Sequence, residues 1–476
     1  MLRTLIGALC FALAAALLAL LAQQRVRSGL DHAAARELAT WHAGHTPWDW
    51  APRQPEDAIA GRAFGAAQLR PAPTGLGITV DSNAAFEVGV PLARPVPLNA
   101  LPQLQLQTDA SAPFHVQISL LDDASRTRIT STGIPIGASE QSTTIALTQL
   151  GWQQAGDGQR HGPPAYSSLL RLRLQAPAGS YLIFHALAWR TAQGAAPAIA
   201  SIPRLALPPG IGAEGLLAVR DHLHQQAPML LVASSLTPTD AGAFSPAPAL
   251  AWALAALWLV LLVNLLASEW RGRHNKALAL LQIAAVCLPW LILAIGLQSL
   301  QTASPALLVS VLGATVYAVL SAARLRPAVW HLADRNTGSW LWAFAPAALA
   351  LLWAGTAAGS VTPRWPDLPH ALTYAGWALL QQTLLLAVVA SRWQGLLPSR
   401  YAAALATAVL FALLHTPNGM LMLLCLAAEC WWAWGFLRQR ALLPVALAHA
   451  LAALALESVM PGLPLRSLEI GARFLQ

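Results

Sequence analysis

Five polar side chains lie inside the long apolar runs of the C-terminal third of the chain: Gln381, Gln382, His415, Glu429 and His449. Polar groups in a membrane span are costly and usually face the interior of a helix bundle or a cavity. At 1.5 Å per residue, Gln381 and both histidines fall within the hydrocarbon, so these groups could meet across facing helices. A carboxylate can accept a proton, and an amide can orient a water molecule or donate to an oxyanion. The pattern predicts a shared polar site.

Each residue also has a purely structural interpretation. A membrane histidine can serve packing or hydrogen bonding, and Glu429 can be a protonated group that ties helices together. Asn418, in His415-Thr-Pro-Asn418, is placed to cap the next helix after a break at Pro417. We also take Asn418 as a candidate substrate-binding residue beside the polar site.

The order of these residues resembles the motifs of the CPBP (Abi) family of intramembrane proteases, which includes the type II CAAX prenyl proteases. That family has an adjacent Glu pair with Arg four beyond the second, then Phe four residues before a His, then a His followed four later by Asn. Phe411-Ala-Leu-Leu-His415 matches the second motif, and His449, preceded by Leu443-Pro444, matches the start of the third. The resemblance covers roughly residues 340–460. It implies peptide-bond hydrolysis within the membrane.

Four positions depart from the family pattern. The Glu pair is Gln381-Gln382, the Arg position holds Leu386, and the closing Asn position holds Ala453. In the family the first Glu is thought to activate water, while the histidines help to bind that water, a metal or the oxyanion. Because a neutral amide cannot act as a general base near pH 7, Glu429 is the candidate replacement.

The resemblance leaves two functions open. The first is a CPBP-type endopeptidase acting on a membrane protein or peptide, for which His415 and His449 are candidate ligands of a divalent metal such as zinc. The second is a non-proteolytic pseudoenzyme, a membrane scaffold or binding protein that acts with cell-envelope or polysaccharide machinery. The glutamine pair favours the second. A transporter is the weakest alternative, because no pair of spans shows the broken symmetric halves of inverted repeats.

The composition shows what must position these groups. Of the 476 residues, 56% are hydrophobic and 11% charged, and the mean hydropathy is +0.51. Globular chains carry about 25% charged residues, so much of this chain faces lipid. In such a chain the net charge of +8 indicates basic residues in cytoplasmic loops rather than a nucleic-acid-binding surface. All four cysteines lie in apolar runs, which excludes a disulfide-rich secreted module.

The apolar runs predict an N-terminal anchor followed by an eight-helix bundle. The anchor, residues 1–22, has an apolar run longer than the about 7–15 residues of a signal peptide, although a cleaved signal is the alternative. The bundle divides into three helices over 248–338 and the motif-bearing helices over 339–460, before a C-terminal tail, 461–476. The expected spans are 248–267, 277–297, 305–323, 340–359, 371–391, 402–418, 419–437 and 441–458.

Basic residues in the short loops set the orientation. With the N-terminus in the cytoplasm, the outer loop and tail hold Arg364, Arg466 and Arg473, against a larger inner set. The inner residues are Arg3, Arg271, Arg273, Lys276, Arg324, Arg326, Arg335, Arg392, Arg400, Arg438 and Arg440. We therefore predict a multi-pass protein of the cell inner membrane, with residues 23–247 extracytoplasmic.

Residues 23–235 are predicted to form an extracytoplasmic β-sandwich, jelly-roll-like, because apolar residues alternate with period two between turn residues. The clearest expected strands are Leu76–Val80, Phe86–Val90, Thr143–Leu147 and Tyr181–Trp189, with further alternation at Leu104–Leu106, Phe114–Leu120 and Leu170–Leu174. A helix is expected near Glu214–Gln225 and a linker over 236–247.

Tryptophans and histidines gather near the start of this domain. Trp41, Trp48 and Trp50 are interpreted as core or membrane-interface residues, with stacking on sugars as the alternative. His42 and His45 have the spacing of metal ligands, but no cysteine or carboxylate cluster joins them. The expected partners of the whole chain are membrane lipid, a membrane protein or peptide substrate and an envelope polysaccharide, with no nucleic acid.

Overall fold

The chain folds into two compact units. The structure, a computed structural model, describes residues 2–139, 141–154, 158–160, 162–235, 247–273, 275–296, 303–324, 337–359, 361–460 and 465–475. One unit, Met1–Leu30, Pro208–Leu217 and Ala241–Gln476, contains the helix bundle. The other, Asp31–Leu207 and Ala218–Asp240, contains the β-sheets. Most of the linker predicted at 236–247 lies outside the described residues.

The first helix, α1, runs from Leu2 to His42 without a break. Its 41 residues correspond to about 60 Å, twice the hydrocarbon thickness of a bilayer. It therefore continues well past residue 22, where we expected the anchor to end. The reason lies in its second half, where the buried Leu30, Ala34 and Trp41 give the helix apolar surface to pack.

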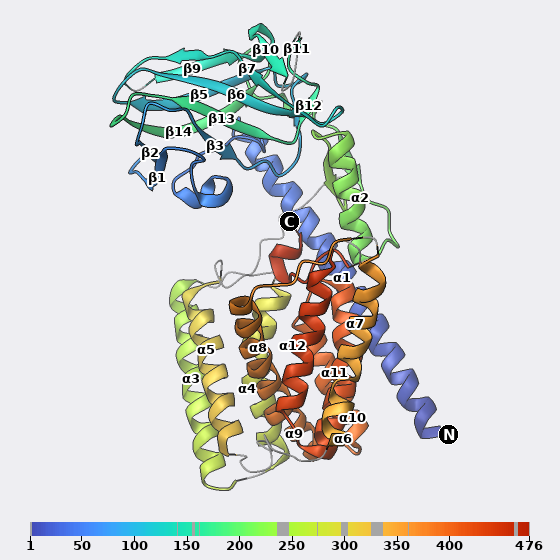
Figure 1. Ribbon diagram of the computed structural model, residues 1–476. Coiled ribbons are helices and arrows are strands. Elements are labelled where there is room, and N and C mark those ends of the chain that lie inside the picture. Colours follow the sequence, from blue (N-terminus) through green and yellow to red (C-terminus); the bar gives the residue numbers. More distant parts are fainter. Residues whose placement is uncertain are drawn as a thin grey trace. The chain divides into compact units, whose positions relative to one another are not determined.

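The β-sheet unit is built from two antiparallel sheets whose inner faces share one core (Figure 1). One sheet has the order β1 (Ala67–Pro71), β2 (Leu76–Val80), β14 (Tyr181–Arg190), β5 (Gln103–Ala110), β9 (Gln141–Ala146). The other has the order β11 (Gly158–Arg160), β10 (Trp152–Gln154), β7 (Thr127–Ser131), β6 (Phe114–Asp122), β13 (Leu170–Gln175), β3 (Phe86–Val90), with β8 (Ile134–Ile136) beside β6.

Short elements complete this unit. Strand β4 (Val96–Pro97) pairs with β12 (Tyr166–Ser167), and β15 (Arg204–Ala206) pairs in parallel with β16 (Leu231–Ala233). The 3₁₀ turns of this unit are η1 (Pro55–Asp57), η2 (Ile59–Gly61), η3 (Leu147–Gln149) and η4 (Ile199–Ser201). Helix α2 (Ala213–Gln226) belongs to this unit from Ala218 onward and to the other unit up to Leu217.

The alternating residues predicted to face a core do so. Leu104 and Leu106 on β5 and Val116 and Ile118 on β6 are all buried, and they belong to one cluster. Such a shared core between two sheets is the defining feature of a sandwich. The β-rich nature of this region is therefore confirmed. The tryptophans near its start are core residues, with Trp41 2% exposed.

A buried charged cluster joins α1, the strand region and α2. Arg94 donates through both terminal nitrogens to the carboxylate of Glu37, and its Nη1 also lies 3.1 Å from His224 Nε2. The guanidinium stacks over Trp48, 5.1 Å from the ring centroid. Burial, and then the positive charges of Arg94 and Arg220, lower the pKa of His224 to about 4. His224 is therefore neutral at pH 7 and accepts a hydrogen bond from Arg94.

Acidification should destabilise the β-sheet unit through His224. An unfolded histidine has a pKa of about 6.5, so between pH 6.5 and 4 the unfolded chain binds a proton that the folded chain does not. Stability should fall as the pH drops through this window, with a slope of at most about 1.4 kcal/mol per pH unit from this group. Thermal unfolding of a 30–240 fragment at pH 7 and pH 5 measures it. His224→Gln should flatten the dependence, whereas the exposed His222→Gln should not; an unchanged slope in His224→Gln would contradict the assignment.

The second unit is a bundle of helices (Figure 1). The helices are α3 (Pro248–Trp270), α4 (Lys276–Ile295), α5 (Pro305–Arg324), α6 (Thr337–Ala343), α7 (Ala345–Ala357), α8 (Leu368–Gln382), the π-helix η5 (Thr383–Ala390), α9 (Ser391–Leu396), α10 (Arg400–Leu413), α11 (Gly419–Gln439), α12 (Leu443–Ser458) and the 3₁₀ turn η7 (Gly471–Leu475).

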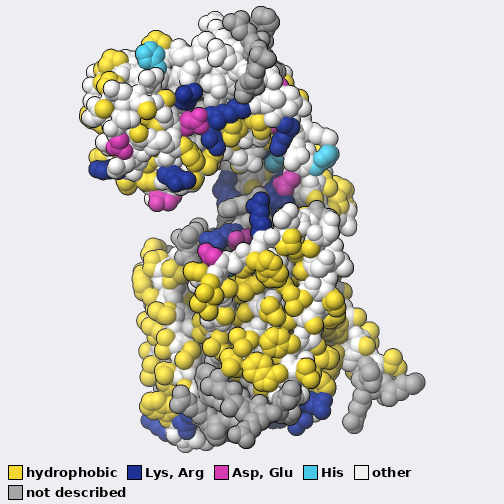
Figure 2. Space-filling model, in the orientation of Figure 1, with side chains coloured by type: hydrophobic (Ala, Val, Ile, Leu, Met, Phe, Trp, Pro, Cys, Tyr) yellow, Lys and Arg dark blue, Asp and Glu magenta, His cyan; other side chains and the backbone are white. Residues whose placement is uncertain are grey.

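Six helices among the described residues are long and apolar enough to cross a membrane: Leu5–His42, Pro248–Trp270, Lys276–Ile295, Pro305–Arg324, Leu368–Leu396 and Gly419–Gln439. The expected spans at 340–359, 402–418 and 441–458 contain shorter apolar helices, Ala345–Ala357, Arg400–Leu413 and Leu443–Ser458. Figure 2 shows hydrophobic side chains covering the side of the bundle, as a lipid-facing surface requires. The protein is a multi-pass membrane protein, and the total of nine spans stays a prediction.

One carboxylate ties four helices of the bundle together. Glu269, in the last turn of α3, is 2% exposed. Its Oε1 accepts hydrogen bonds at 2.7 to 3.1 Å from Tyr317 and Ser321 of α5, Gln282 of α4 and Arg392 of α9. The first bundle span was expected to end at residue 267, which would leave Glu269 in a loop, but α3 continues to Trp270.

Candidate functional site

The C-terminal helices bring three of the predicted site residues into direct contact. Gln382, the last residue of α8, donates from Nε2 to Glu429 Oε2 on α11 at 3.0 Å. The same nitrogen lies 3.2 Å from Nδ1 of His449 on α12. Gln382 and Glu429 are fully buried and His449 is 7% exposed. One amide group thus links a carboxylate and an imidazole contributed by two other helices.

The hydrogen-bond partners indicate which ring nitrogen of each histidine carries the proton. Because Gln382 donates to Nδ1 of His449, the His449 proton lies on Nε2, which can donate. Nδ1 of His415 lies 2.8 Å from the carbonyl oxygen of Phe411, an acceptor, so that nitrogen carries the proton. Nε2 of His415 is then a free acceptor. With these tautomers, His449 has a donor at Nε2 and His415 has an acceptor at Nε2.

Aromatic rings hold both imidazoles in place. The ring of Phe411 packs edge-on against His415, with centroids 4.6 Å apart, and against His449, at 5.5 Å. Trp432 and Tyr374 contact His449 from other directions. The Phe-x-x-x-His spacing therefore places Phe411 where it touches both histidines.

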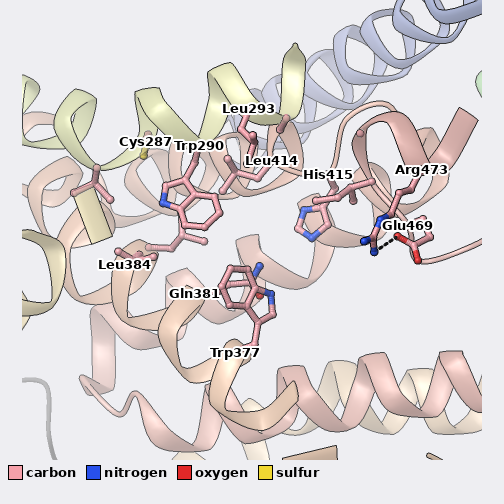
Figure 3. A pocket seen from close by; sticks show the side chains of 15 residues that line it. Cys287, Trp290, Leu293, Trp377, Gln381, Leu384, Leu414, His415, Glu469 and Arg473 are labelled. Atoms are coloured by element: carbon pink, nitrogen blue, oxygen red, sulfur yellow. Dashed lines mark ion pairs between the residues drawn. The ribbon is translucent and has the colours of Figure 1, made fainter. Parts of the chain in front are cut away.

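His415 lines a cavity of about 360 Å³ within the bundle. The walls are mostly apolar and come from α4, α8, η5, the end of α10 and the C-terminal segment (Figure 3). Trp290 and Trp377 lie 5.8 Å apart by their ring centroids. The polar lining consists of Gln381, His415 and the Glu469–Arg473 pair, whose charged atoms are 3.8 Å apart. Such a cavity suits an apolar ligand with one polar end.

The two adjacent glutamines face different parts of the site. Gln381 lines the cavity with His415, whereas Gln382 contacts Glu429 and His449. We expected Gln381 to be the glutamine close to both histidines; for the contact with His449 the structure has Gln382 instead. Successive residues of a helix point about 100° apart, so two neighbours cannot face one site equally. The π-helix η5 begins directly after Gln382, a geometry that is frequent at functional sites.

Asn418 caps α11, as expected, by accepting from the backbone nitrogen of Leu421 at 3.1 Å. Its amide also donates to the carbonyl oxygens of Ser467 and Glu469, at 2.7 and 3.2 Å. Asn418 thereby fastens the C-terminal segment that closes part of the cavity. Its polar contacts are all with backbone, and a substrate-binding role stays a prediction. The sequence held no signal for the tail residues Glu469 and Arg473.

A zinc site needs at least three protein ligands that are free to bind the metal. Among the described residues, no group of three or more His, Cys, Asp or Glu side chains could hold a metal ion. Nδ1 of His449 is occupied by an amide proton and Nδ1 of His415 by its own proton, which leaves His415 Nε2 as the one free imidazole lone pair of the two. This donor set does not fit a zinc site, and no step is derived through a metal.

Two oxygen atoms in the buried contact lack a hydrogen-bond partner in the described part of the chain. They are Gln382 Oε1 and Glu429 Oε1. An unpaired buried oxygen is costly and needs an explanation, such as a bound water or substrate group. The second oxygen of Glu429 is therefore free to accept a proton or bind a water.

Comparison with known proteins bears on both units. No curated protein matches the chain. Two solved structures resemble part of it: BiXyn10A CBM1 APO (10% identity, 30% of this chain and 89% of that chain, TM-score 0.19) and the family 11 carbohydrate-binding module of cellulosomal cellulase Lic26A-Cel5E of Clostridium thermocellum (12% identity, 27% and 83%, TM-score 0.21). Scores this low support no inference about fold or ligand.

The match in the bundle is more informative. Residues 377–455 match the sequence profile of the family described as type II CAAX prenyl endopeptidase Rce1-like. The matched segment contains Gln381, Gln382, His415, Glu429 and His449. The resemblance of these helices to the CPBP family is thus confirmed.

Proposed function

We propose that the chain is a CPBP-type intramembrane endopeptidase that hydrolyses a peptide bond of a membrane-embedded substrate. The observation that carries the proposal is the buried contact of Gln382 with Glu429 and His449, within the segment that matches the family profile. Three polar groups from three helices would be an expensive arrangement if it served packing alone.

The hydrogen bonds support the following assignment of roles. Glu429 accepts the proton of the attacking water through its unpaired Oε1 and then returns it to the leaving amine nitrogen as the peptide C–N bond breaks. His449 donates from Nε2 to the oxyanion that develops on the scissile carbonyl. Gln382 holds both groups in position, and His415 orients the polar end of the substrate in the cavity through its free Nε2. The apolar walls of the cavity receive the membrane-embedded part of the substrate.

A cleavage assay tests the proposal. The full chain would be reconstituted in liposomes with single-span reporter peptides that carry a fluorophore and a quencher across the candidate bond. Wild-type protein should cleave at least one reporter, and His449→Ala should remove the cleavage. Cleavage that persists unchanged in His449→Ala would count against the assigned site.

A second candidate is a non-proteolytic scaffold, which the glutamine pair favours. In the family an adjacent Glu pair occupies the positions of Gln381 and Gln382, and an amide is no base. A scaffold would cleave no reporter, and Gln382→Ala would change assembly with an envelope partner, measured by cross-linking in cells, without a catalytic loss. Cleavage by the wild type would exclude this candidate.

We further propose that the protein lies in the inner membrane with residues 23–247 outside the cytoplasm. The support is the excess of basic residues in the loops on the other side. An alkaline phosphatase fusion at about residue 150 should be active and one at about residue 330 inactive. Fusions to a cytoplasm-active reporter at the same two sites serve as the control and should give the reverse pattern. An active phosphatase at 330 would contradict the orientation.

The β-sheet unit is proposed to recruit the partner on which the bundle acts. An envelope polysaccharide is the partner class that suits it, because a polar cleft on one of its sheets offers amide and hydroxyl groups. Binding of polysaccharide by the full chain, compared with a chain lacking this unit, tests the recruitment.

A further inference from the structure

A cleft of about 380 Å³ lies on the face of the five-stranded sheet that points away from the sandwich core. Its lining comes from the end of α1, the loop that follows it and three adjacent strands, β9, β5 and β14. On β5 the side chains alternate, so that Leu104 and Leu106 face the core while Gln105 and Gln107 face the cleft. We call this feature the Asp49 cleft, after the carboxylate at its edge.

Small side chains and a strand irregularity create the hollow. Ala186 and Ala188 of β14 and Ala51 of the loop line the cleft and leave space above the sheet. The pairing of β14 with β5 shifts register between Phe184 and Ala186, and such a bulge re-aims the side chains that follow it. The loop is held at the edge by two backbone hydrogen bonds between Trp50 and Leu187, at 2.7 and 2.8 Å.

The charged groups of the cleft neutralise one another. Asp49 Oδ1 accepts from Thr46 Oγ1 at 2.7 Å and from the backbone nitrogen of Trp189 at 2.9 Å. Its Oδ2 accepts from Arg190 Nη1 at 3.2 Å, and His45 Nδ1 lies 3.3 Å away. The carboxylate is thus fixed, and its charge is balanced by Arg190. Because the charges of Asp49 and Arg190 balance, the cleft favours an uncharged ligand over an ion.

The remaining lining groups are neutral donors and acceptors. Gln105 donates to Ser142 Oγ at 2.9 Å across the β5–β9 pair, and the exposed Gln107 lies next along the same face. Amides and hydroxyls both donate and accept, as the hydroxyl groups of a sugar do. The fixed carboxylate and guanidinium add stronger, charge-assisted partners at one end.

We propose that the Asp49 cleft binds a short stretch of a neutral saccharide, through Gln105, Gln107 and Ser142 along the strands and Asp49 and Arg190 at the edge. The inference deepens the polysaccharide recruitment proposed above and rests on it. It names the site and the ligand class: uncharged sugar units rather than uronic acids or phosphorylated lipids.

The test measures binding of defined tetrasaccharides to the full chain. The protein is kept in a detergent without a sugar head group, since a maltoside would compete. Cellotetraose, maltotetraose and chitotetraose are the neutral probes and tetragalacturonate the charged one, with binding followed by calorimetry. At least one neutral probe should bind with a dissociation constant of about 1 mM or tighter, and more tightly than tetragalacturonate. If the cleft binds internal units of a saccharide chain, a polymer of the same sugar should compete with the tetrasaccharide. If it binds chain ends, the tetrasaccharide alone should bind.

Matched variants assign the binding to the cleft. Gln107→Ala should weaken the affinity about fivefold, and Gln105→Ala combined with Gln107→Ala about 20-fold, because each loses a hydrogen bond. Gln103→Ala is the control: it lies on the same strand and face but bonds to Ala192 outside the cleft, and should stay within about twofold. Absence of binding to all neutral probes, tighter binding of tetragalacturonate, or equal effects of Gln103→Ala and Gln107→Ala would each overturn the proposal.

The same variants separate this inference from the peptidase proposal. His449→Ala should leave saccharide affinity unchanged, and Gln107→Ala should leave cleavage of a free single-span reporter unchanged. A wild-type protein that binds the sugar but cleaves no reporter would contradict the peptidase proposal alone. A wild-type protein that cleaves the reporter but binds no sugar would contradict the saccharide proposal alone.

Discussion

Glu429→Gln should lower kcat/KM for a cleaved reporter at least about 100-fold, the scale expected when a positioned general base is removed. The substitution is nearly isosteric and can keep a hydrogen bond to Gln382, so the fold should survive. What it removes is the capacity of Oε1 to take a proton from water. The measurement is steady-state cleavage in liposomes, with the unfolding midpoint recorded for each variant.

Two further variants distinguish the general base from the oxyanion donor. His449→Ala removes the proposed oxyanion donor, a loss of about 10²–10³ in kcat. Glu457→Gln is the matched control, since Glu457 lies on the same helix as His449 but is exposed and pairs with His370 at 3.2 Å. If Glu429→Gln keeps full activity, Glu429 is not the base. His415, whose Nε2 is free in the cavity, would then be the group to substitute next.

The strands were predictable from the sequence because their signal is local. Leu76–Val80 and Phe86–Val90 have the predicted bounds, and Tyr181–Arg190 extends the prediction by one residue. Period-two alternation depends only on which face is buried, and here one face of each strand packs into a shared core. Short strands such as Gly158–Arg160 carry too few residues for a period to appear.

The site was only partly predictable, since its remaining features depend on how helices rotate and pack. The sequence singled out Gln381 and Gln382 together, but only the helix geometry decides that Gln382 meets Glu429 and Gln381 faces the cavity. Arg473 lines the cavity because Asn418 anchors the tail near it, a contact between residues far apart in sequence. Neither relation leaves a pattern in the amino-acid order.

The buried carboxylate of Glu269 was not predicted from the sequence, for a further reason. Hydropathy averages over a window, and a charged residue at the end of a helix resembles the start of a loop. Only the packed structure shows that Gln282, Tyr317, Ser321 and Arg392 all point at its Oε1. Charged residues near the ends of predicted spans are therefore worth testing as structural groups.

Glu269→Ala should destabilise the bundle by about 3–5 kcal/mol, because it leaves the guanidinium of Arg392 buried without its partner. The Glu269 side chain is 3% exposed and that of Arg392 15%, so water cannot replace the lost charge well. The measurement is the free energy of unfolding of the full chain in mixed micelles titrated with SDS. Glu457→Ala, which breaks an exposed pair with His370, is the control and should cost less than about 1 kcal/mol.

A double variant separates the buried charge from the lost contacts. Glu269→Met combined with Arg392→Met removes both charges and keeps apolar volume, and such replacements are often neutral or stabilising. The double variant should therefore be more stable than Glu269→Ala, although Gln282 and Tyr317 still lose an acceptor. If Glu269→Ala unfolds like Glu457→Ala, the carboxylate does not hold the four helices together. If the double variant is no better than the single one, the hydrogen bonds to Glu269, and not the uncompensated arginine, account for the loss.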